Sequence, residues 1–310
     1  MSARGAAGAG GLRREGRRAP AALRRHGPWA PWLFVAPLLL LLLFVFGQSL
    51  VRLVEFSFKM VRGIDGPWIG FRNYRLVLGQ PLFWEAVGHN LLLLLAVPLM
   101  TGLSLLVALL LHDRMRGWRA HRTVLFLPYI LAIPIVAVVA KQMLQLDGPV
   151  NRVLRAVGLD ALALDWIGSG DVALWTVMGI IVWRESALGV ILFLSRLMSL
   201  DEAVTEAARI DGATWWQRAT RVLLPQMRDV IGFFAMVSVI TMLTAVFAYV
   251  YMIGGGRGGP GTSTVVAELY VYNALTRQSL PGVAAAVSVM IFAVAVGLIG
   301  LLAALRRREA

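Results

Sequence analysis

Long stretches without a single charged residue recur along this chain of 310 residues, and the first of them runs from Gly27 to Val51. A helix needs about 20 apolar residues to cross the hydrocarbon core of a bilayer. Because that core holds no water, the polar groups of the backbone have to be bonded inside the segment, which a helix achieves by itself. The stretches therefore predict an all-α integral membrane protein.

Six stretches are expected to be transmembrane helices, at about 30–51, 87–111, 122–141, 172–195, 230–253 and 282–305. Together they form one domain, residues 27–310. The first stretch is longer than the core of a cleaved signal peptide, roughly 7–15 residues, so we interpret it as an uncleaved span. Residues 1–26 are rich in alanine, glycine and arginine and are expected to be a disordered basic tail. Pro128 and Pro134 are expected to kink the third span.

Composition agrees with a membrane protein and excludes several kinds of chemistry. Hydrophobic residues make up 58% of the chain, and its mean hydropathy is +0.73. There is no cysteine, so disulfides, thiolate metal sites and cysteine nucleophiles are excluded. The net charge of +13 is carried by basic residues spread over the loops between apolar stretches. Membrane topology accounts for that pattern, so no nucleic-acid partner is expected.

The basic residues also predict the side of the membrane on which each loop lies, since cytoplasmic loops carry an excess of lysine and arginine. With both termini in the cytoplasm, the basic tail, the loop after the second span, the segment 199–225 and the C-terminal arginines all lie on that side. The loop 52–81 disagrees, because it would be external and yet carries five basic residues. The prediction of cytoplasmic termini therefore depends on the other segments.

The segment from Ser199 to Pro225 is polar, unlike its surroundings. Ser199 with Glu202 has the spacing of a capping box, which starts a helix. Gly212 can end that helix, because glycine tolerates left-handed backbone angles. A second capping box, Thr214 with Gln217, restarts a helix, and Pro225 is expected to break it. Taken alone, this helical hairpin is either a solvated connection between two spans or a docking element.

The hairpin resembles the EAA loop of the permease subunits of binding-protein-dependent ABC importers. The family pattern is E-A-A-x3-G-x9-I-x-L-P, and this sequence departs from it only at Val222, which stands for isoleucine. The resemblance implies the type I ABC importer permease fold and a coupling helix that contacts a cytoplasmic ATPase subunit. It assigns ATPase coupling to Glu206, Ala207, Ala208, Arg209, Asp211, Gly212, Leu224 and Pro225.

Two further segments resemble the same family. Gly70–Asn90 is similar to its G-x-x-N-Y segment, although an interfacial helix anchored by Phe71, Tyr74, Phe83 and Trp84 explains these residues equally well. Gly254–Thr264 is similar to the GGPxxST loop of carbohydrate-type permeases, in particular of the first subunit of a heterodimeric pair, as in importers of the maltose and glycerol-3-phosphate type. Its glycines and proline predict a shaped loop.

Polar residues inside two predicted spans are candidates for a substrate pathway. Ionisable residues within a bilayer are costly and normally face a bundle interior or a wet cavity, as expected for Arg184 and Glu185. They could instead neutralise each other, but adjacent residues do not face each other on a helix, which argues against that pairing. In the fifth span, hydroxyls and aromatic rings suit a sugar, although serine and threonine also join helices. These residues are Ser238, Thr241, Thr244 and Tyr249.

The sequence has no sign of an enzyme. No Walker A motif, H-E-x-x-H pair or G-x-S-x-G elbow is present, so no catalytic residue, metal or cofactor is assigned. The resemblance implies a permease of the bacterial inner or plasma membrane with three kinds of partner: a second homologous permease, two cytoplasmic ATPase subunits and an extracytoplasmic solute-binding protein. Two alternatives remain, a permease of an amino-acid or peptide ABC importer and, from another class, a membrane-embedded enzyme or sensor.

Overall fold

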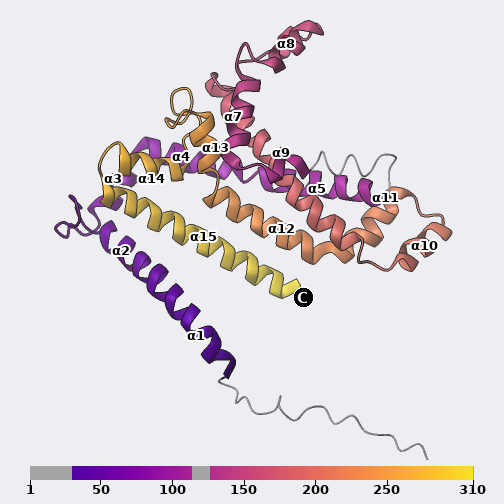
Figure 1. The fold of residues 1–310 in the computed structure, drawn as a ribbon, viewed down its shortest axis with the longest axis horizontal. Helices are drawn as coiled ribbons and strands as arrows, with labels where there is room; N and C mark the ends of the chain where they lie inside the picture. Colours follow the sequence, from indigo (N-terminus) through magenta and orange to yellow (C-terminus); the bar gives the residue numbers. More distant parts are fainter. Residues whose placement is uncertain (1–29, 114–125, 310) are drawn as a thin grey trace, which may run out of the picture. The chain divides into compact units, whose positions relative to one another are not determined.

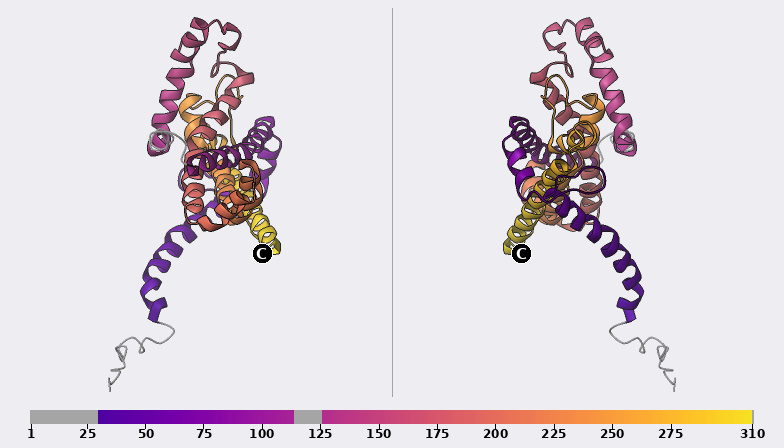
Figure 2. Two further views of the ribbon diagram at one scale, coloured as in Figure 1. Left: turned by 90° about the vertical axis from the view of Figure 1, so that its right-hand side faces the viewer. Right: turned by 90° about the vertical axis from the view of Figure 1, so that its left-hand side faces the viewer.

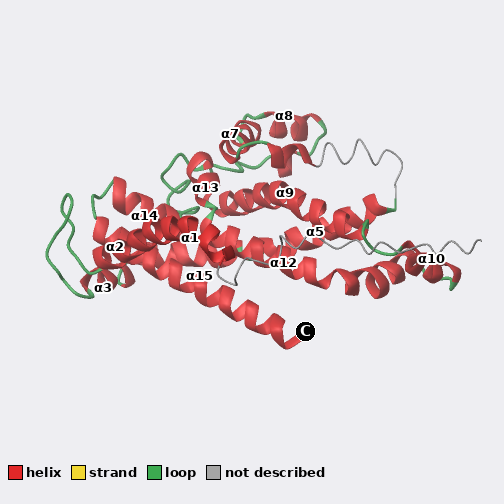
Figure 3. Cartoon of the chain, turned by 60° about the horizontal axis from the view of Figure 1, so that its bottom comes forward, coloured by secondary structure: helices red, strands yellow, loops and turns green. Residues whose placement is uncertain are grey.

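The computed structural model describes residues 30–113 and 126–309, so the basic tail 1–26 lies outside the described residues. The chain forms two compact units, residues 1–51 and residues 52–310. The described part is built from helices and loops, and its two β-bridges are isolated pairs that belong to no strand (Figure 3). The predicted all-α class is confirmed for these residues.

The first unit consists of α1 (Ala30–Leu42), the π-helical turn η2 (Leu43–Gly47) and the start of α2 (Gln48–Ser57). Its apolar side chains are open to the surroundings: Leu33 is 76% exposed and Phe34 is 82% exposed. Water would disfavour an exposed surface of this kind along a whole helix, whereas lipid would not. The unit therefore has the character of a membrane span with a lipid-facing surface.

The second unit contains the remaining helices. Before the hairpin they are α3 (Arg72–Leu78), α4 (Pro81–Leu93), α5 (Ala96–His112), α7 (Ile133–Leu144), α8 (Pro149–Ala156), η3 (Asp160–Leu162) and α9 (Gly170–Leu197). From the hairpin onward they are α10 (Glu202–Ile210), α11 (Trp215–Gln217), η4 (Arg218–Leu223), α12 (Leu224–Thr244), α13 (Phe247–Ile253), α14 (Ala267–Thr276) and α15 (Pro281–Glu309). Proline is the first residue of α4, α8 and α15, where its missing N–H would have no helical partner in any case.

Helices α5, α9 and α12 run beside one another and enclose the main core (Figures 1 and 3). The rings of Phe193 and Phe234 meet edge to face with their centroids 5.3 Å apart. Ser104 in α5 donates a hydrogen bond of 2.8 Å to the carbonyl oxygen of Ser186 in α9. Small residues at this crossing let the two backbones approach closely, as is common between membrane helices.

Gly189 makes that approach possible, and its replacement is a first test. A side chain at Gly189 would overlap Oγ of Ser104, and its Cβ would lie 2.7 Å from Cζ of Phe234. We expect Gly189→Val to lower the free energy of unfolding by about 1–3 kcal/mol, the usual cost of overpacking. Gly179→Val is the matched control in the same helix, because a Cβ added there would meet no atom of another segment within 4 Å. Equal melting temperatures of the two purified variants would contradict this packing.

Five helical segments are long and apolar enough to cross a membrane: Trp32–Ser57, Pro81–His112, Gly170–Leu197, Trp215–Thr244 and Pro281–Leu301. They correspond to five of the six predicted spans. The third predicted span is not among them, since part of it lies outside the described residues and the helix is interrupted. Residues 126–130 are helical, Leu131 and Ala132 are not, and α7 starts again at Ile133. Pro134 follows directly, so the kink predicted there is confirmed as a break, whereas the helical residues 126–130 continue through Pro128 without one.

The loop Gly254–Thr264 is tied to one face of α4. Thr262 donates a hydrogen bond of 2.6 Å to Glu85, and the ring of His89 lies 2.7 Å from the carbonyl oxygen of Val265. The side-chain oxygen of Asn90 accepts a hydrogen bond of 2.8 Å from the backbone N–H of Ala267, at the start of α14. The predicted shaped loop is confirmed. In Figure 2 it lies near α13 and α14, while α7 and α8 extend away from them.

The G-x-x-N-Y segment braces the turn that follows the first span. The side-chain amide of Asn73 donates hydrogen bonds of 2.9 Å to the carbonyl oxygens of Ser57 and Lys59. The hydroxyl of Tyr74 donates one of 2.8 Å to Oγ of Ser57. Of the four expected interfacial anchors, Phe71 and Trp84 are exposed, Tyr74 is half-buried and Phe83 is 5% exposed in a small core with Tyr270. The anchor role of Phe83 was therefore wrong.

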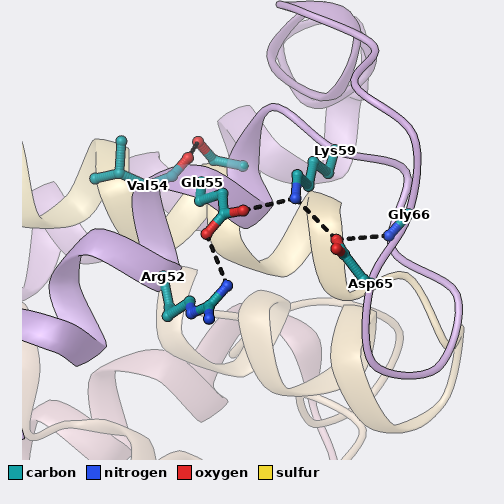
Figure 4. Close-up of polar contacts among 7 residues, drawn as sticks. Arg52, Val54, Glu55, Lys59, Asp65 and Gly66 are labelled. Atoms are coloured by element: carbon teal, nitrogen blue, oxygen red, sulfur yellow. Dashed lines mark hydrogen bonds and ion pairs between the residues drawn. The ribbon is translucent and has the colours of Figure 1, made fainter.

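Within this turn, Lys59 is held between two carboxylates (Figure 4). Its ammonium lies 2.6 Å from Glu55 and 2.9 Å from Asp65, and 5.3 Å from the ring centre of Trp68. Hydrogen bonds to the two carboxylates raise the pKa of Lys59, and the hydrogen bond from Lys59 lowers the pKa of Asp65. The contribution of Asp65 is thus present above its ordinary pKa of 3.8 and is lost as the pH falls through its lower folded value.

We expect Lys59→Met to lower the melting temperature, because Glu55 and Asp65 would lose the cation that lies between them. The raised pKa of Lys59 means that its contribution is lost only when the pH rises through a folded value above 10.5. The decrease should therefore stay constant between about pH 5 and pH 9. Arg52→Met is the control, since that arginine is 58% exposed and pairs with Glu55 from the solvent side. An equal or larger effect in the control would contradict the central position of Lys59.

Candidate functional site

The polar hairpin between α9 and α12 begins differently from its predicted form. Asp201, and not Ser199, caps α10: its carboxylate accepts a hydrogen bond of 2.9 Å from the N–H of Ala203. The hydroxyl of Ser199 instead donates a hydrogen bond of 2.7 Å to the carbonyl oxygen of Arg196 at the end of α9. The predicted capping box of Ser199 and Glu202 was therefore wrong, because aspartate two residues later is also a strong cap.

The first arm of the hairpin ends at Gly212 as predicted. Gly212 has a φ of +77°, in the left-handed region that other residues rarely adopt. Its N–H donates to the carbonyl oxygen of Arg209, and the N–H of Ala213 donates to that of Ala208, both at 3.0 Å. These bonds satisfy carbonyl groups that the end of α10 would otherwise leave free.

The second arm starts as predicted but does not stop at Pro225. Thr214 and Gln217 form a complete capping box. From Trp215 the chain stays helical to Thr244, passing through the π-turn η4, so the predicted break at Pro225 was wrong. Pro225 is only the second residue of α12, and the wider spacing of the π-turn before it accommodates its missing N–H. The second arm is thus the start of the fifth span.

Helix α10 has no buried residue. Glu206, Ala207 and Arg209 are exposed, and Ile210 is 82% exposed. A cavity of about 730 Å³ separates α10 from the ends of α5 and α9, and Leu111 and Leu197 are among the residues that line it. An amphipathic helix that stands away from its own core has the form of a docking element.

The other predicted coupling residues lie around the turn and at the start of α12. Asp211 is exposed beside Gly212, Ala208 is half-buried, Leu224 packs against the main core and Pro225 is exposed. Two residues with contacts at this site, Asp113 and Trp215, were missed in the sequence. Asp113, directly after α5, accepts a hydrogen bond of 2.5 Å from the indole N–H of Trp215. No motif marks Asp113, because it is 102 residues away from Trp215 in the chain.

The polar residues of the fourth span form a network inside the bundle. Arg184 lies 2.6 Å from Glu185, and the hydroxyl of Tyr249 donates a hydrogen bond of 2.7 Å to the same carboxylate. The argument against pairing of Arg184 with Glu185 was therefore wrong: the side chains of adjacent residues are long enough to curl together. Arg184 also donates to the carbonyl oxygens of Tyr129 and Leu131, at 3.3 and 2.9 Å. Those carbonyls lie at the break in the third span, where helical partners are lost.

The serine and threonine hydroxyls of the fifth predicted span do not join this network. Thr241 and Thr244 donate hydrogen bonds of 3.0 and 2.8 Å to carbonyl oxygens one turn earlier in their own helix. Ser238 is buried. Helix α12 ends at Thr244, and Tyr249 lies beyond it in α13. Of the predicted pathway residues, the structure brings Arg184, Glu185 and Tyr249 together and leaves Ser238, Thr241 and Thr244 apart.

Comparison with known proteins places the chain in a family. No protein-family model matches it. It is 31% identical over 269 residues to the lactose transport system permease protein of Rhizobium radiobacter, covering 86% of this chain and 90% of that protein. It is 29% identical to the multiple sugar-binding transport system permease protein of Streptococcus mutans, covering 88% and 93%.

A solved structure has the same fold. It is the bacterial alginate ABC transporter in complex with an alginate pentasaccharide-bound periplasmic protein, one chain of which matches with a TM-score of 0.78 at 23% identity, over 91% of this chain and 95% of that one. The chain therefore belongs to the family of ABC transporter permeases, multi-pass membrane proteins that form the non-catalytic part of a transporter. Within that family, it is similar to the permease proteins of sugar transport systems.

Proposed function

We propose that this chain is the permease of an ATP-driven importer for a sugar or a sugar-like solute. The names of its relatives support the substrate class, since they include lactose and multiple-sugar transport systems. In the related solved structure, the bound periplasmic protein holds an alginate pentasaccharide. The glycine-rich loop Gly254–Thr264, which resembles that of carbohydrate-type permeases, supports the same class.

The observation that carries the coupling role is the exposure of α10. A helix with no buried residue, an exposed Ile210 and a left-handed glycine at its end is built to contact another protein. In the proposed importer, α10 contacts a cytoplasmic ATPase subunit through Glu206, Ala207 and Ala208. Closure of two such subunits on ATP moves the hairpin and shifts the spans between inward- and outward-facing states, as alternating access requires.

The remaining parts of the assembly follow from this role. A second, homologous permease supplies the other half of the translocation pathway, and a solute-binding protein delivers the substrate from outside. With six spans both termini lie on the same side of the membrane, and the excess of basic residues in the tail, the hairpin and the C-terminal segment supports the cytoplasm as that side. Arg184, Glu185 and Tyr249 form the polar part of this chain's share of the pathway, since ionisable residues within a span usually face its interior or a wet cavity.

Photo-cross-linking tests the contact between the hairpin and the ATPase. A photoactivatable phenylalanine analogue at position 210, in the complete importer purified from membranes, should cross-link to the nucleotide-binding subunit. The same analogue at position 64 is the control, because Ile64 is 93% exposed in the loop after the first span. Mass spectrometry identifies the adduct. If position 210 gives no adduct with a nucleotide-binding subunit, the coupling role is wrong.

Thiol labelling tests the sidedness. Because the chain has no cysteine, Ile210→Cys and Ile64→Cys each introduce a single thiol. A membrane-impermeant maleimide should label Ile64→Cys in spheroplasts and Ile210→Cys only in inverted vesicles. The reverse pattern would place the hairpin outside and overturn the proposal.

For the substrate class, calorimetric titration of the purified partner binding protein with disaccharides and amino acids should give heat only with sugars.

A further inference from the structure

Both arms of the hairpin converge on one carboxylate that belongs to neither of them. Trp215, at the start of the second arm, donates its indole N–H to Oδ2 of Asp113 at 2.5 Å. Arg209, in the last turn of the first arm, donates to Oδ1 of the same residue at 3.5 Å. Asp113 is the residue that directly follows α5, so it joins the hairpin to the end of the second span.

Helix α10 packs against η4, but few other polar contacts hold it in place. Within the described residues, the contact of Arg209 with Asp113 is the one hydrogen bond or ion pair between a side chain of α10 and another helix or its cap. The cavity of about 730 Å³ lies between α10 and the ends of α5 and α9. A displacement of α10 therefore reaches the spans through the backbone of the hairpin, through its packing against η4 and through Asp113.

The two contacts with Asp113 differ in strength. The side chains of Arg209 and Asp113 are 57% and 27% exposed, and an exposed ion pair of this kind contributes little to stability. The contact of Arg209 at 3.5 Å is at the limit of hydrogen-bond length, so the bond from Trp215 is the stronger of the two. Trp215 is also half-buried.

On the other side of the contact, Asp113 is fixed to a packed pair of helices. The backbone N–H of Asp113 donates to the carbonyl oxygen of Leu109 in α5, at 3.3 Å. Helix α5 packs along α9 through the bond from Ser104 to Ser186 and the close approach at Gly189. Two residues before Ser186, α9 carries Arg184, which holds the break in the third span. A force on Asp113 is thus applied to α5 and α9 together.

We propose that Asp113 is a positioning residue that transmits the movement of the hairpin to α5 and α9. The proposal rests on the proposed role of the hairpin as the ATPase contact. Asp113→Ala removes both contacts. Asp113→Asn removes the negative charge from both contacts but keeps an amide oxygen that can accept from Trp215, so it is the conservative variant that should rescue function.

The experiment measures solute uptake and ATP hydrolysis by the complete importer in proteoliposomes. Asp113→Ala should lower the solute transported per ATP by about fivefold or more, the lower end of usual coupling energies. Asp113→Asn should stay within about twofold of the wild type, because its amide oxygen still accepts a hydrogen bond from Trp215. Asp147→Ala is the matched control: Asp147 also follows a helix and pairs with an arginine, Arg155, at 3.6 Å, but it is far from the hairpin in sequence and is 83% exposed.

The cross-link from position 210 separates this proposal from the one on which it rests. Absence of the adduct in the wild type refutes the ATPase contact itself. An adduct that persists in Asp113→Ala together with a lowered ratio of transport to ATP supports Asp113 as a positioning residue. If the adduct disappears in Asp113→Ala, this residue only keeps the hairpin folded and the proposal is wrong. It is also wrong if Asp113→Ala transports normally.

Discussion

Gly212→Pro is expected to lower solute uptake by about tenfold or more, within the range of usual coupling energies, while the protein still reaches the membrane. Proline fixes φ near −65°, whereas Gly212 has a φ of +77°. Proline also removes the N–H that donates to Arg209. The turn between the two arms would open and α10 would lose its orientation, so ATP hydrolysis would continue without matching transport. Uptake and ATPase activity in proteoliposomes measure this.

Gly158→Pro is a closely matched control for Gly212→Pro. Gly158 has a φ of +78°, its N–H donates to the carbonyl oxygen of Arg155, and the next N–H donates five residues back, from Leu159 to Leu154. The hydrogen bonds at Gly158, where α8 ends, therefore have the same pattern as those at Gly212, where α10 ends. Backbone damage is equal in the two variants, and only the location differs. Normal uptake by Gly212→Pro, or an equal loss in Gly158→Pro, would refute a specific role of the hairpin.

Arg184→Met is expected to destabilise the protein by on the order of 3 kcal/mol, since removing one partner of a buried ion pair leaves an uncompensated charge. The side chains of Arg184 and Glu185 are 10% and 13% exposed. The variant would also leave the carbonyl oxygens of Tyr129 and Leu131 without their donor. Thermal unfolding in detergent measures the loss, and uptake should fall with the amount of folded protein.

The double variant Arg184→Met, Glu185→Met tests the cause of that loss. Replacing both charges by apolar side chains is often close to neutral, so it should recover most of the stability that Arg184→Met loses. If the double variant melts no higher than the single one, the charge on Glu185 is not the cause. A stable double variant that fails to take up solute would assign the pair to the substrate pathway, and normal uptake would make it structural.

Patterns that depend on neighbouring residues were predictable from the sequence. The turn at Gly212 and the capping box of Thr214 and Gln217 are set by local backbone chemistry, and the structure has both. Competition within one segment was harder to resolve. Asp201 displaced Ser199 as the cap of α10, and the π-turn before Pro225 let the helix continue, although a proline alone favours a break.

Contacts between distant segments could not be predicted. Nothing in the sequence pairs Asp113 with Trp215, or Arg184 with the carbonyl group of Leu131, because these contacts exist only once α5, α9 and the interrupted third span are packed. The polar character of Arg184 and Glu185 was visible in the sequence. Their hydrogen-bond partners were not, since a long side chain can reach several positions from one place on a helix.

The uninterrupted helix from Trp215 to Thr244 has a mechanical consequence. Its 30 residues span about 45 Å at 1.5 Å per residue, so a tilt applied beside the hairpin is carried rigidly across most of the bilayer thickness. The first interruption of this helix is not at Pro225 but at Ala245 and Val246, where the helix ends. Tyr249 lies just beyond this interruption and donates a hydrogen bond to Glu185. The point at which the fifth predicted span can bend is thus next to the buried ion pair of Arg184 and Glu185.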